Sequence, residues 1–296
     1  MVYSNSITDQ IGNTPLIEVT NIIKNKKVRL FLKLEGDNPG GSVKDRPAFN
    51  MINEALKRGD IKKGGHLVEA TSGNTGIALA FIAKLFGLNI SLVMPDNSTE
   101  ERVKTMRAYG AEVILTSSDR GIEASRDLAF ELRDKKGYVL LNQFENDDNW
   151  KAHYKTTGPE IWKDTQGEVT HFVSAMGTTG TIMGVSTYLK EKNKNITIVG
   201  AQPIDGSKIP GIRKWSLDYV PKFFDKSKVD QVIEVSEEEA ALMTRQLAKE
   251  EGVFAGMSSG GAVASALKVA QELDKGIIVT VICDRGDRYL SSNLFE

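Results

Sequence analysis

The chain has 296 residues, and its 38 lysines and arginines nearly balance its 39 aspartates and glutamates, for a formal net charge of -1. A chain of this length exceeds the size at which one hydrophobic core usually stops growing, so two α/β domains separated by a cleft are expected. The balanced charge lacks the broad positive field of a duplex-binding surface, which argues against nucleic acid as a partner.

The cysteine content and the apolar runs of the chain bear on its compartment. Cys283 is the only cysteine, so no disulfide can form within the chain, and a reducing compartment, by default the cytoplasm, is predicted. Residues 1–10 are polar and do not show the pattern of a secretory signal. The most apolar long stretch, residues 77–94, is interrupted by Lys84 and Asn89, so no membrane span is expected.

Short apolar runs alternate with segments of helical period, the pattern that predicts parallel sheets covered by helices. The expected fold class is therefore α/β with two open-sheet lobes, and a first strand ends near Glu35. The first lobe is predicted to contain four strands, at residues 66–70, 89–94, 112–116 and 138–144. Its helices are predicted at residues 47–58, 75–86 and 122–136, and from a capping box of Ser98 and Glu101 to Gly110.

A polar stretch at residues 145–149 is the predicted boundary, because it separates a finished series of strands and helices from a new helix at Trp150. The second lobe is predicted to contain strands at residues 171–176, 196–202 and 276–283. Its helices are predicted after Gly180 and, with a capped start, from Ser236 to Glu251. Residues 203–230 are weakly periodic, and loops of that length in compact domains are usually functional or mobile.

A glycine- and threonine-rich turn joins the strand that ends at Met176 to the next helix, and it consists of Gly177, Thr178, Thr179, Gly180 and Thr181. Free backbone N–H groups at the positive end of a helix form a phosphate-binding cup. The turn lacks the Lys-Ser/Thr of a P-loop and the glycine spacing of a dinucleotide fingerprint, so a nucleotide site is disfavoured. The alternative is an ordinary strand-to-helix turn.

Two more turns of small polar residues precede helices. The turn at residues 71–76 suits a carboxylate, because backbone N–H groups and the hydroxyls of Thr71, Ser72 and Thr75 can hold the anion. The Asn74 amide can donate to a second oxygen, although N-capping alone is the alternative. The turn at residues 256–261 is less specific, and a neutral hydroxyl there could face a ring nitrogen.

Lys44 lies between a glycine-rich stretch at residues 38–43 and the first predicted helix. Such a lysine is usually a solvated surface charge. A lysine amine that enters a cleft is desolvated, its pKa falls, and it becomes competent for Schiff-base chemistry and proton transfer. The neighbouring polar turns favour this second interpretation.

Five segments, in this order and at this spacing over nearly the whole chain, resemble the O-acetylserine sulfhydrylases, a family of fold-type II pyridoxal-phosphate enzymes. They are residues 11–16 (IGNTPL), 41–45 (GSVKD), 71–76 (TSGNTG), 177–181 (GTTGT) and 258–261 (SSGG). Residues 209–215 and 283–290 resemble the B-type isozyme of that family, which accepts thiosulfate as well as sulfide. The A-type isozyme typically has an uncharged Pro-Ser-Ser-Gly in place of residues 283–286.

The resemblance implies a role for each matching residue. Lys44 would be the Schiff-base lysine, Asn74 the partner of the ring hydroxyl of pyridoxal 5'-phosphate, and Ser258 the partner of its ring nitrogen. The turn from Gly177 to Thr181 would hold the phosphate. The substrate carboxylate would be held by Thr71, Ser72, Thr75 and Gln143. Arg213 is the candidate for steering dianionic thiosulfate, with Arg285 and Arg288 as further sources of positive potential.

The resemblance also implies the activity and the assembly. The reaction would be β-replacement on O-acetyl-L-serine with sulfide or thiosulfate, giving L-cysteine or S-sulfocysteine plus acetate. Residues 36–148 would form the smaller lobe and residues 149–296 the larger one, which residues 1–35 would join because the amino-terminal strand of the family crosses to pack with it. A homodimer is expected, and docking of a serine acetyltransferase is not, because the B-type isozyme generally does not form that complex.

Two other functions remain open from the sequence. One is another enzyme of the same fold, such as a serine or threonine dehydratase or a cystathionine β-synthase. The other is a non-catalytic cofactor-binding scaffold, which the intact Lys44 argues against. His66, His153 and His171 have no i, i+4 spacing, so neither a zinc site nor a catalytic triad is predicted, and ordinary packing or hydrogen bonding is expected of them.

Overall fold

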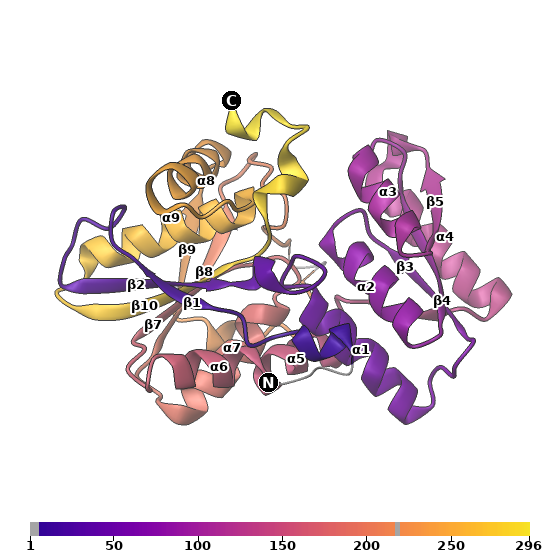
Figure 1. Ribbon diagram of the computed structural model, residues 1–296, viewed down its shortest axis with the longest axis horizontal. Helices are drawn as coiled ribbons and strands as arrows, with labels where there is room; N and C mark the ends of the chain where they lie inside the picture. Colours follow the sequence, from indigo (N-terminus) through magenta and orange to yellow (C-terminus); the bar gives the residue numbers. More distant parts are fainter. Residues whose placement is uncertain (1–5, 217–219) are drawn as a thin grey trace.

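The computed structural model describes residues 6–216 and 220–296, which form two sheets with helices packed against both. The sheets lie beside each other in Figure 1, with the helices α1 (Asp45–Arg58) and α5 (Asp147–Lys155) between them. One sheet has six strands in the order β1-β2-β10-β7-β8-β9, and the other has four in the order β5-β4-β3-β6. The predicted α/β class with two open sheets is confirmed.

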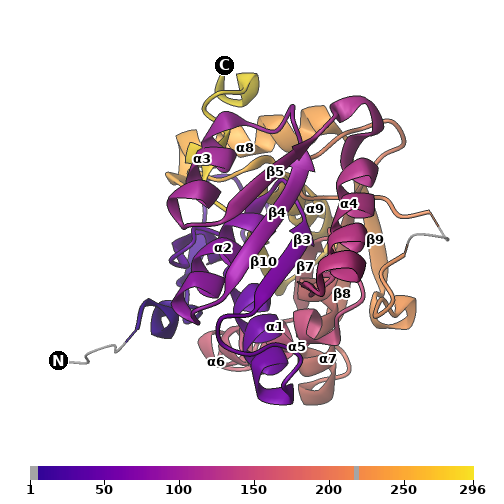
Figure 2. The ribbon, with the colours of Figure 1, turned by 90° about the vertical axis from the view of Figure 1, so that its right-hand side faces the viewer.

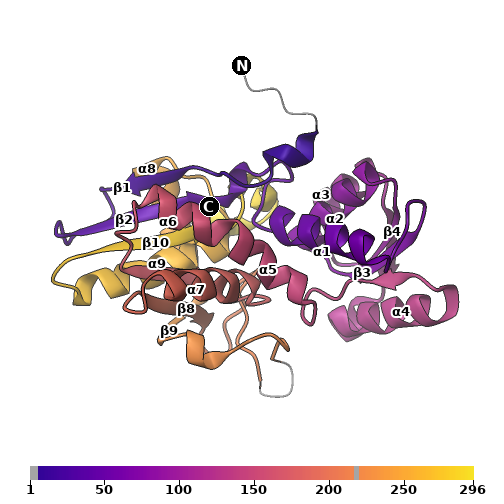
Figure 3. The same ribbon diagram turned by 90° about the horizontal axis from the view of Figure 1, so that it is seen from below.

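The four-stranded sheet is parallel throughout, and its three longer strands run side by side in Figure 2. Its strands are β3 (His66–Ala70), β4 (Asn89–Pro95), β5 (Glu112–Thr116) and β6 (Val139–Leu140). The helices around it are α1 (Asp45–Arg58), α2 (Asn74–Leu85), α3 (Glu100–Ala108) and α4 (Gly121–Lys136). Figure 3 shows α2 on one side of the sheet and α4 on the other, so both faces are covered and the strands are mostly apolar.

The six-stranded sheet combines both ends of the chain, because β2 pairs in parallel with β10 while β1 pairs antiparallel with β2. Its strands are β1 (Leu16–Val19), β2 (Val28–Leu34), β7 (His171–Ala175), β8 (Thr197–Pro203), β9 (Gln231–Val235) and β10 (Gly276–Ile282). The helices are α5 (Asp147–Lys155), α6 (Thr157–Asp164), α7 (Gly180–Lys192), α8 (Glu237–Glu251) and α9 (Met257–Glu272). In Figure 1, α8 and α9 lie on one side of this sheet and α6 and α7 on the other.

Three predicted element boundaries are wrong. Ser98 does not cap α3, since its hydroxyl donates to Pro95 O at 2.6 Å, and the N-cap is Thr99. β6 ends at Leu140 rather than at residue 144, because Asn142 adopts a left-handed conformation with φ of 53° and turns the chain. The next helix begins at Asp147, capped by Asn146, and not at Trp150. The strand β9 and the helix α6 were not predicted at all.

The long loop predicted at residues 203–230 is irregular in its described part, apart from a short 3-10 helix at Lys226–Lys228. Residues 217–219 of that prediction lie outside the described residues. Among the helices that the structure describes, none is both long and apolar enough to cross a bilayer.

Candidate active site

A cleft of about 1310 Å³ opens between the two sheets, at the carboxyl ends of β3 and β7. Ligands in open α/β sheets bind at this end of the strands, because the strand-to-helix turns gather there. Every site residue predicted from the sequence lines this cleft. They are Lys44, Thr71, Ser72, Asn74, Thr75, Gln143, Gly177, Thr178, Thr179, Gly180, Thr181, Arg213 and Ser258.

Lys44 is the residue just before α1, and its side chain is half-buried. The segment before it is tied to the end of β10, because Val43 N donates to Cys283 O at 2.8 Å and Ser42 bridges to Asp284. Within the described part of the chain, Nζ of Lys44 has no hydrogen-bond acceptor and no ion-pair partner. The amine is therefore free to react with a group in the cleft.

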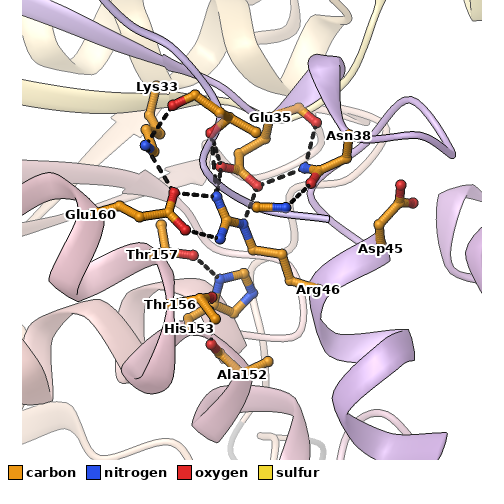
Figure 4. A network of polar contacts seen from close by, with 12 residues as sticks. Lys33, Glu35, Asn38, Asp45, Arg46, Ala152, His153, Thr156, Thr157 and Glu160 are labelled. Atoms are coloured by element: carbon orange, nitrogen blue, oxygen red, sulfur yellow. Dashed lines mark hydrogen bonds and ion pairs between the residues drawn. The ribbon is translucent and has the colours of Figure 1, made fainter. Parts of the chain in front are cut away.

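A buried ionic network fixes the start of α1 (Figure 4). Arg46 pairs with Glu35 at 2.6 Å and with Glu160 at 2.6 Å, and Lys33 pairs with Glu160 at 2.9 Å. Burial would raise the pKa of Glu35, but the charge and hydrogen bonds of Arg46 outweigh burial and bring that pKa to about 2. The network joins β2, α1 and α6. Because Arg46 is two residues after Lys44, the network also fixes the backbone at Lys44.

His153 on α5 connects the region of this ionic network to the turn at residues 177–181. Its Nδ1 lies 2.9 Å from Thr157 Oγ1 and its Nε2 lies 3.3 Å from Thr181 Oγ1. Burial, together with the charge of Arg46, lowers the pKa of His153 to about 3, so the ring is neutral. The expected hydrogen-bonding role of this histidine is confirmed, and its partner belongs to the cleft.

The 177–181 turn approaches its neighbours so closely that two of its positions must be glycine. A Cβ on Gly180 would lie 2.1 Å from Asn149 Oδ1, and one on Gly177 would lie 2.6 Å from Gly211 O. Thr179 has a left-handed backbone with φ of 67°, and its buried Oγ1 has no hydrogen-bond partner among the described residues. An unpaired hydroxyl and the free N–H groups of the first turn of α7 suit a phosphate group.

The 71–76 turn is linked to the 177–181 turn through side chains. Thr75 Oγ1 donates to Gln143 Oε1 at 2.8 Å. Asn149 Nδ2 donates to Gln143 O at 2.6 Å and to Thr178 Oγ1 at 3.2 Å. The two turns therefore face each other across the cleft, and these hydrogen bonds fix the distance between them.

Glu69 is a buried residue of β3 that sequence reasoning missed. Its Oε2 accepts from Asn142 N at 3.0 Å, and so it supports the left-handed turn that directs Gln143 toward Thr75. Burial, only partly opposed by backbone hydrogen bonds from Asn142 and Gln143, raises its pKa to about 7. A carboxylate next to the apolar residues Leu67, Val68 and Ala70 of a predicted strand was the available signal.

Asn74 contacts the segment that follows β10. Its Nδ2 donates to Asp284 Oδ2 at 2.7 Å, and its Oδ1 accepts from Arg288. Arg288 also donates to Gly40 O, while Arg285 pairs with Asp287 at the surface. Neither arginine lines the cleft. Sequence reasoning missed Asp284 and gave Arg288 only a role in the potential around the cleft.

Ser258 lies in the first turn of α9, where it is 4% exposed. Gly211 passes over it, since a Cβ there would lie 3.3 Å from Ser258 Oγ. Cys283 lines the cleft nearby, and burial raises the pKa of its thiol to about 11. The cysteine is therefore protonated at neutral pH, in keeping with a packing role.

Arg213 belongs to the long loop, and its N donates to Met176 O at 2.8 Å. Its guanidinium carbon lies 5.9 Å from the ring of Phe144 and 5.3 Å from that of Trp215, with the side chain exposed at the mouth of the cleft. Stacking on two aromatic rings orients a cation without neutralising it. No group of three or more metal-binding side chains occurs within residues 6–216 and 220–296.

A family model described as pyridoxal-phosphate dependent enzyme matches residues 7–284, so the chain belongs to the pyridoxal-phosphate-dependent enzymes, and pyridoxal phosphate is its cofactor. Among its relatives, cysteine synthase B of Pseudomonas aeruginosa is 55% identical over 98% of this chain and 97% of the relative. Cysteine synthase B of Escherichia coli is 54% identical over 98% of this chain and 96% of the relative. The resemblance found in the motifs is confirmed.

Solved structures of similar proteins share the fold. Cysteine synthase from Entamoeba histolytica has a TM-score of 0.94 at 38% identity, covering 99% of this chain and 91% of that chain. O-ureido-L-serine synthase has a TM-score of 0.94 at 37% identity, covering 99% of this chain and 96% of that chain. The unpaired amine of Lys44 and the unpaired hydroxyl of Thr179 fit the aldehyde and the phosphate of the cofactor.

Proposed function

We propose that the protein catalyses β-replacement on O-acetyl-L-serine, in which sulfide takes the place of acetate and L-cysteine is formed. The observation that carries this proposal is the cleft, where the free amine of Lys44 faces the same space as the 71–76 and 177–181 turns. Relatives named cysteine synthase B, at 54% to 55% identity over nearly the full chain, support the proposal.

Each turn has a task in this reaction. Pyridoxal phosphate, when bound, supplies an electron sink for the substrate's Cα. Lys44 would bind the cofactor through its amine, and this amine would also be the group that takes the Cα proton. The phosphate would be held at the positive end of α7. That anchor consists of Gly177, Thr178, Thr179, Gly180 and Thr181.

The remaining residues set orientation. Asn74 would donate to the ring hydroxyl. Ser258 would offer a neutral hydroxyl to the ring nitrogen and, unlike an aspartate, would not hold a proton there, which would favour loss of acetate over transamination. The substrate carboxylate is held by hydroxyl and amide groups of the small polar turn and of the strand beside it. These are Thr71, Ser72, Thr75 and Gln143.

The sulfur donor is proposed to include thiosulfate, which would give S-sulfocysteine. Arg213 supports this proposal, because its oriented cation at the mouth of the cleft would attract a dianion more strongly than hydrosulfide. Replacing Arg213 with Ala is expected to lower kcat/KM for thiosulfate about tenfold while sulfide use changes less than about twofold. Equal losses with both donors, measured in steady state, would contradict the selective role.

We further propose a smaller lobe at residues 36–148, a larger lobe at residues 149–296 to which residues 1–35 also belong, and a homodimer without a serine acetyltransferase partner. Lobes of this size, each with its own sheet, match the expected size of a domain. A cytoplasmic location suits the single free thiol, Cys283. Light scattering of the purified protein, with and without an added acetyltransferase, measures the assembly.

Turnover of the parent and of Lys44→Ala tests the function directly. The parent should release cysteine and acetate from O-acetylserine and sulfide, while Lys44→Ala should lose ~10³-fold or more of kcat without losing its fold. Product analysis distinguishes other enzymes of the class, since a dehydratase releases a keto acid and ammonia. Near-parental turnover by Lys44→Ala would refute the role of this lysine.

A further inference from the structure

We propose that Arg288 and Asp284 are positioning residues that fix the side-chain amide of Asn74, so that its free N–H is directed at the ring hydroxyl of the cofactor. The inference rests on the role proposed above for Asn74. It assigns a function to the segment after β10, which the reaction itself leaves unused. It also explains why Arg288, which does not line the cleft, contacts Asn74, which does.

The contacts of Asn74 admit one orientation of its amide. Arg288 can only donate hydrogen bonds, and it donates to Oδ1. Asp284 Oδ2 accepts from Nδ2 at 2.7 Å. A flipped amide would set Nδ2 against the guanidinium and Oδ1 against the carboxyl, and it would lose both hydrogen bonds. One of the two N–H groups on Nδ2 remains, and Asn74 lines the cleft.

Asp284 is itself held rigidly. It is 1% exposed, and the same Oδ2 accepts from Tyr289 OH at 2.6 Å. Gly256 leaves space for it, since a Cβ at that position would lie 2.2 Å from Asp284 Oδ1. The acceptor for Asn74 is therefore fixed by the six-stranded part of the molecule, from which β10 leads directly into this segment.

Arg288 joins two segments that face the cofactor. Besides Asn74 it binds Gly40 O, in the turn that leads to Lys44, and the N–H of Gly40 donates to Asp45 Oδ2 at 2.5 Å. Gly41, with φ of +78°, allows this approach, because a Cβ there would lie 2.6 Å from the guanidinium. One planar group thus sets the distance between the turn before Lys44 and the start of α2.

The partners of Arg288 distinguish it from a surface ion pair. Both groups that it contacts are neutral carbonyl oxygens, and among the described residues it forms no ion pair. Arg285, three residues earlier on the same segment, instead pairs with the exposed Asp287 at 3.1 Å. The chain therefore offers a matched control within one short segment.

A double-mutant cycle between Arg288 and Asn74 tests the inference, with binding of pyridoxal phosphate and the absorption spectrum of the bound cofactor as readouts. Arg288→Met should weaken cofactor binding about tenfold and shift the absorption band. In the Asn74→Ala background the same substitution should weaken binding clearly less than in the parent, because the contact with Asn74 is already absent and only the contact with Gly40 O is lost. Arg285→Met should leave binding and spectrum unchanged.

Three outcomes would overturn the inference. If Arg288→Met binds the cofactor as the parent does and gives the same spectrum, the contact with Asn74 has no effect on the cofactor. If the losses of the two single variants add up in the double variant, Arg288 acts independently of Asn74. If Asn74→Ala alone binds the cofactor normally, the role proposed for Asn74 fails first. Should Arg288→Met not fold, Arg288→Lys decides the question, because an ammonium cannot replace a planar fork and should give the same coupled pattern at smaller amplitude.

Discussion

At the scale of single residues, Glu69 shows how a buried carboxyl group supports a binding turn. The carboxyl is 4% exposed, and it accepts a hydrogen bond from Asn142 N. The turn that it supports presents Gln143 to Thr75, which is where the substrate carboxylate is proposed to lie. Glu69 therefore supports the site indirectly, through its hydrogen bond to the backbone, and does not itself contact the substrate.

Replacing Glu69 with Gln should make stability less dependent on pH. The pKa of Glu69 is about 7 in the folded protein, against an ordinary value of 4.5, so the folded state binds more protons between these values. The contribution of this group to the free energy of unfolding therefore falls as pH rises from 4.5 to 7. Relative to the parent, the free energy of unfolding of the variant should therefore rise by roughly 1–3 kcal/mol when the pH is raised from 4.5 to 8.

Urea unfolding of both proteins at the two pH values measures this difference. The glutamine oxygen can still accept the backbone N–H groups, so any constant offset between the proteins cancels in the comparison. A stability difference that is the same at both pH values would mean that Glu69 is not protonated near neutrality.

At the scale of elements, the ionic network around Arg46 holds α1 against β2 and α6. Arg46 and Glu35 are 2% and 0% exposed, so their charges are compensated almost entirely by each other and by Glu160. Removing one partner of such a pair leaves a buried charge without compensation, which costs more than the pair contributes. The network thus positions Lys44 through the first turn of its helix.

Arg46→Met should destabilise the protein by about 3–5 kcal/mol. The loss should shrink as pH falls from 4.5 toward 2, because the pKa of Glu35 in the folded parent is about 2 and the parent therefore loses the stabilisation from its ionised Glu35 over this range. Adding Glu35→Gln should restore part of the loss. Arg29→Met is the control, since its pair with Glu18 is exposed and screened by solvent, so its loss should change stability far less. Similar losses in Arg46→Met and in the control would contradict this account.

Local sequence signals predicted elements well where local contacts determine them. Ser236 and Glu239 form a capping box at the start of α8, with Glu239 N donating to Ser236 Oγ at 3.0 Å. Ser98 and Glu101 have the same spacing but form none, because a turn pairs both the N–H and the hydroxyl of Ser98 with Pro95 O. The strand β9 was missed because it is mostly exposed and lacks an apolar run.

The site could be predicted as far as its parts are contiguous in sequence. The turns at residues 71–76 and 177–181 are runs whose residue types and helix starts are visible in the chain. The contacts that orient them are not, since Asn142 and Glu69 are 73 positions apart and Asn74 and Asp284 are 210 apart. Only tertiary packing brings these partners together, within the four-stranded sheet for Asn142 and Glu69 and between the two sheets for Asn74 and Asp284.

At the scale of the whole molecule, the cofactor site lies between two sheets that have separate cores. A ligand that binds groups from both sheets stabilises their arrangement, by about 2.7 kcal/mol at a hundredfold excess over its Kd. Pyridoxal phosphate should accordingly raise the Tm of cofactor-free protein by ~5 °C or more.

Pyridoxal without the phosphate is the control for that measurement. It can react with Lys44 but cannot bind the 177–181 turn, so its effect on Tm should be clearly smaller. Thermal unfolding followed by circular dichroism compares the two. Equal shifts would mean that the turn at the start of α7 does not hold the phosphate.

The pairing of β2 with β10 has a consequence for the order of events during synthesis. β2 begins at Val28, and its parallel partner begins at Gly276. A nascent chain on the ribosome therefore exposes one edge of β2, with the apolar Leu30 and Leu32, until residues 276–282 emerge. All strands of the four-stranded sheet lie within residues 66–140, so this sheet can form much earlier. During synthesis it can therefore fold before the six-stranded sheet is complete.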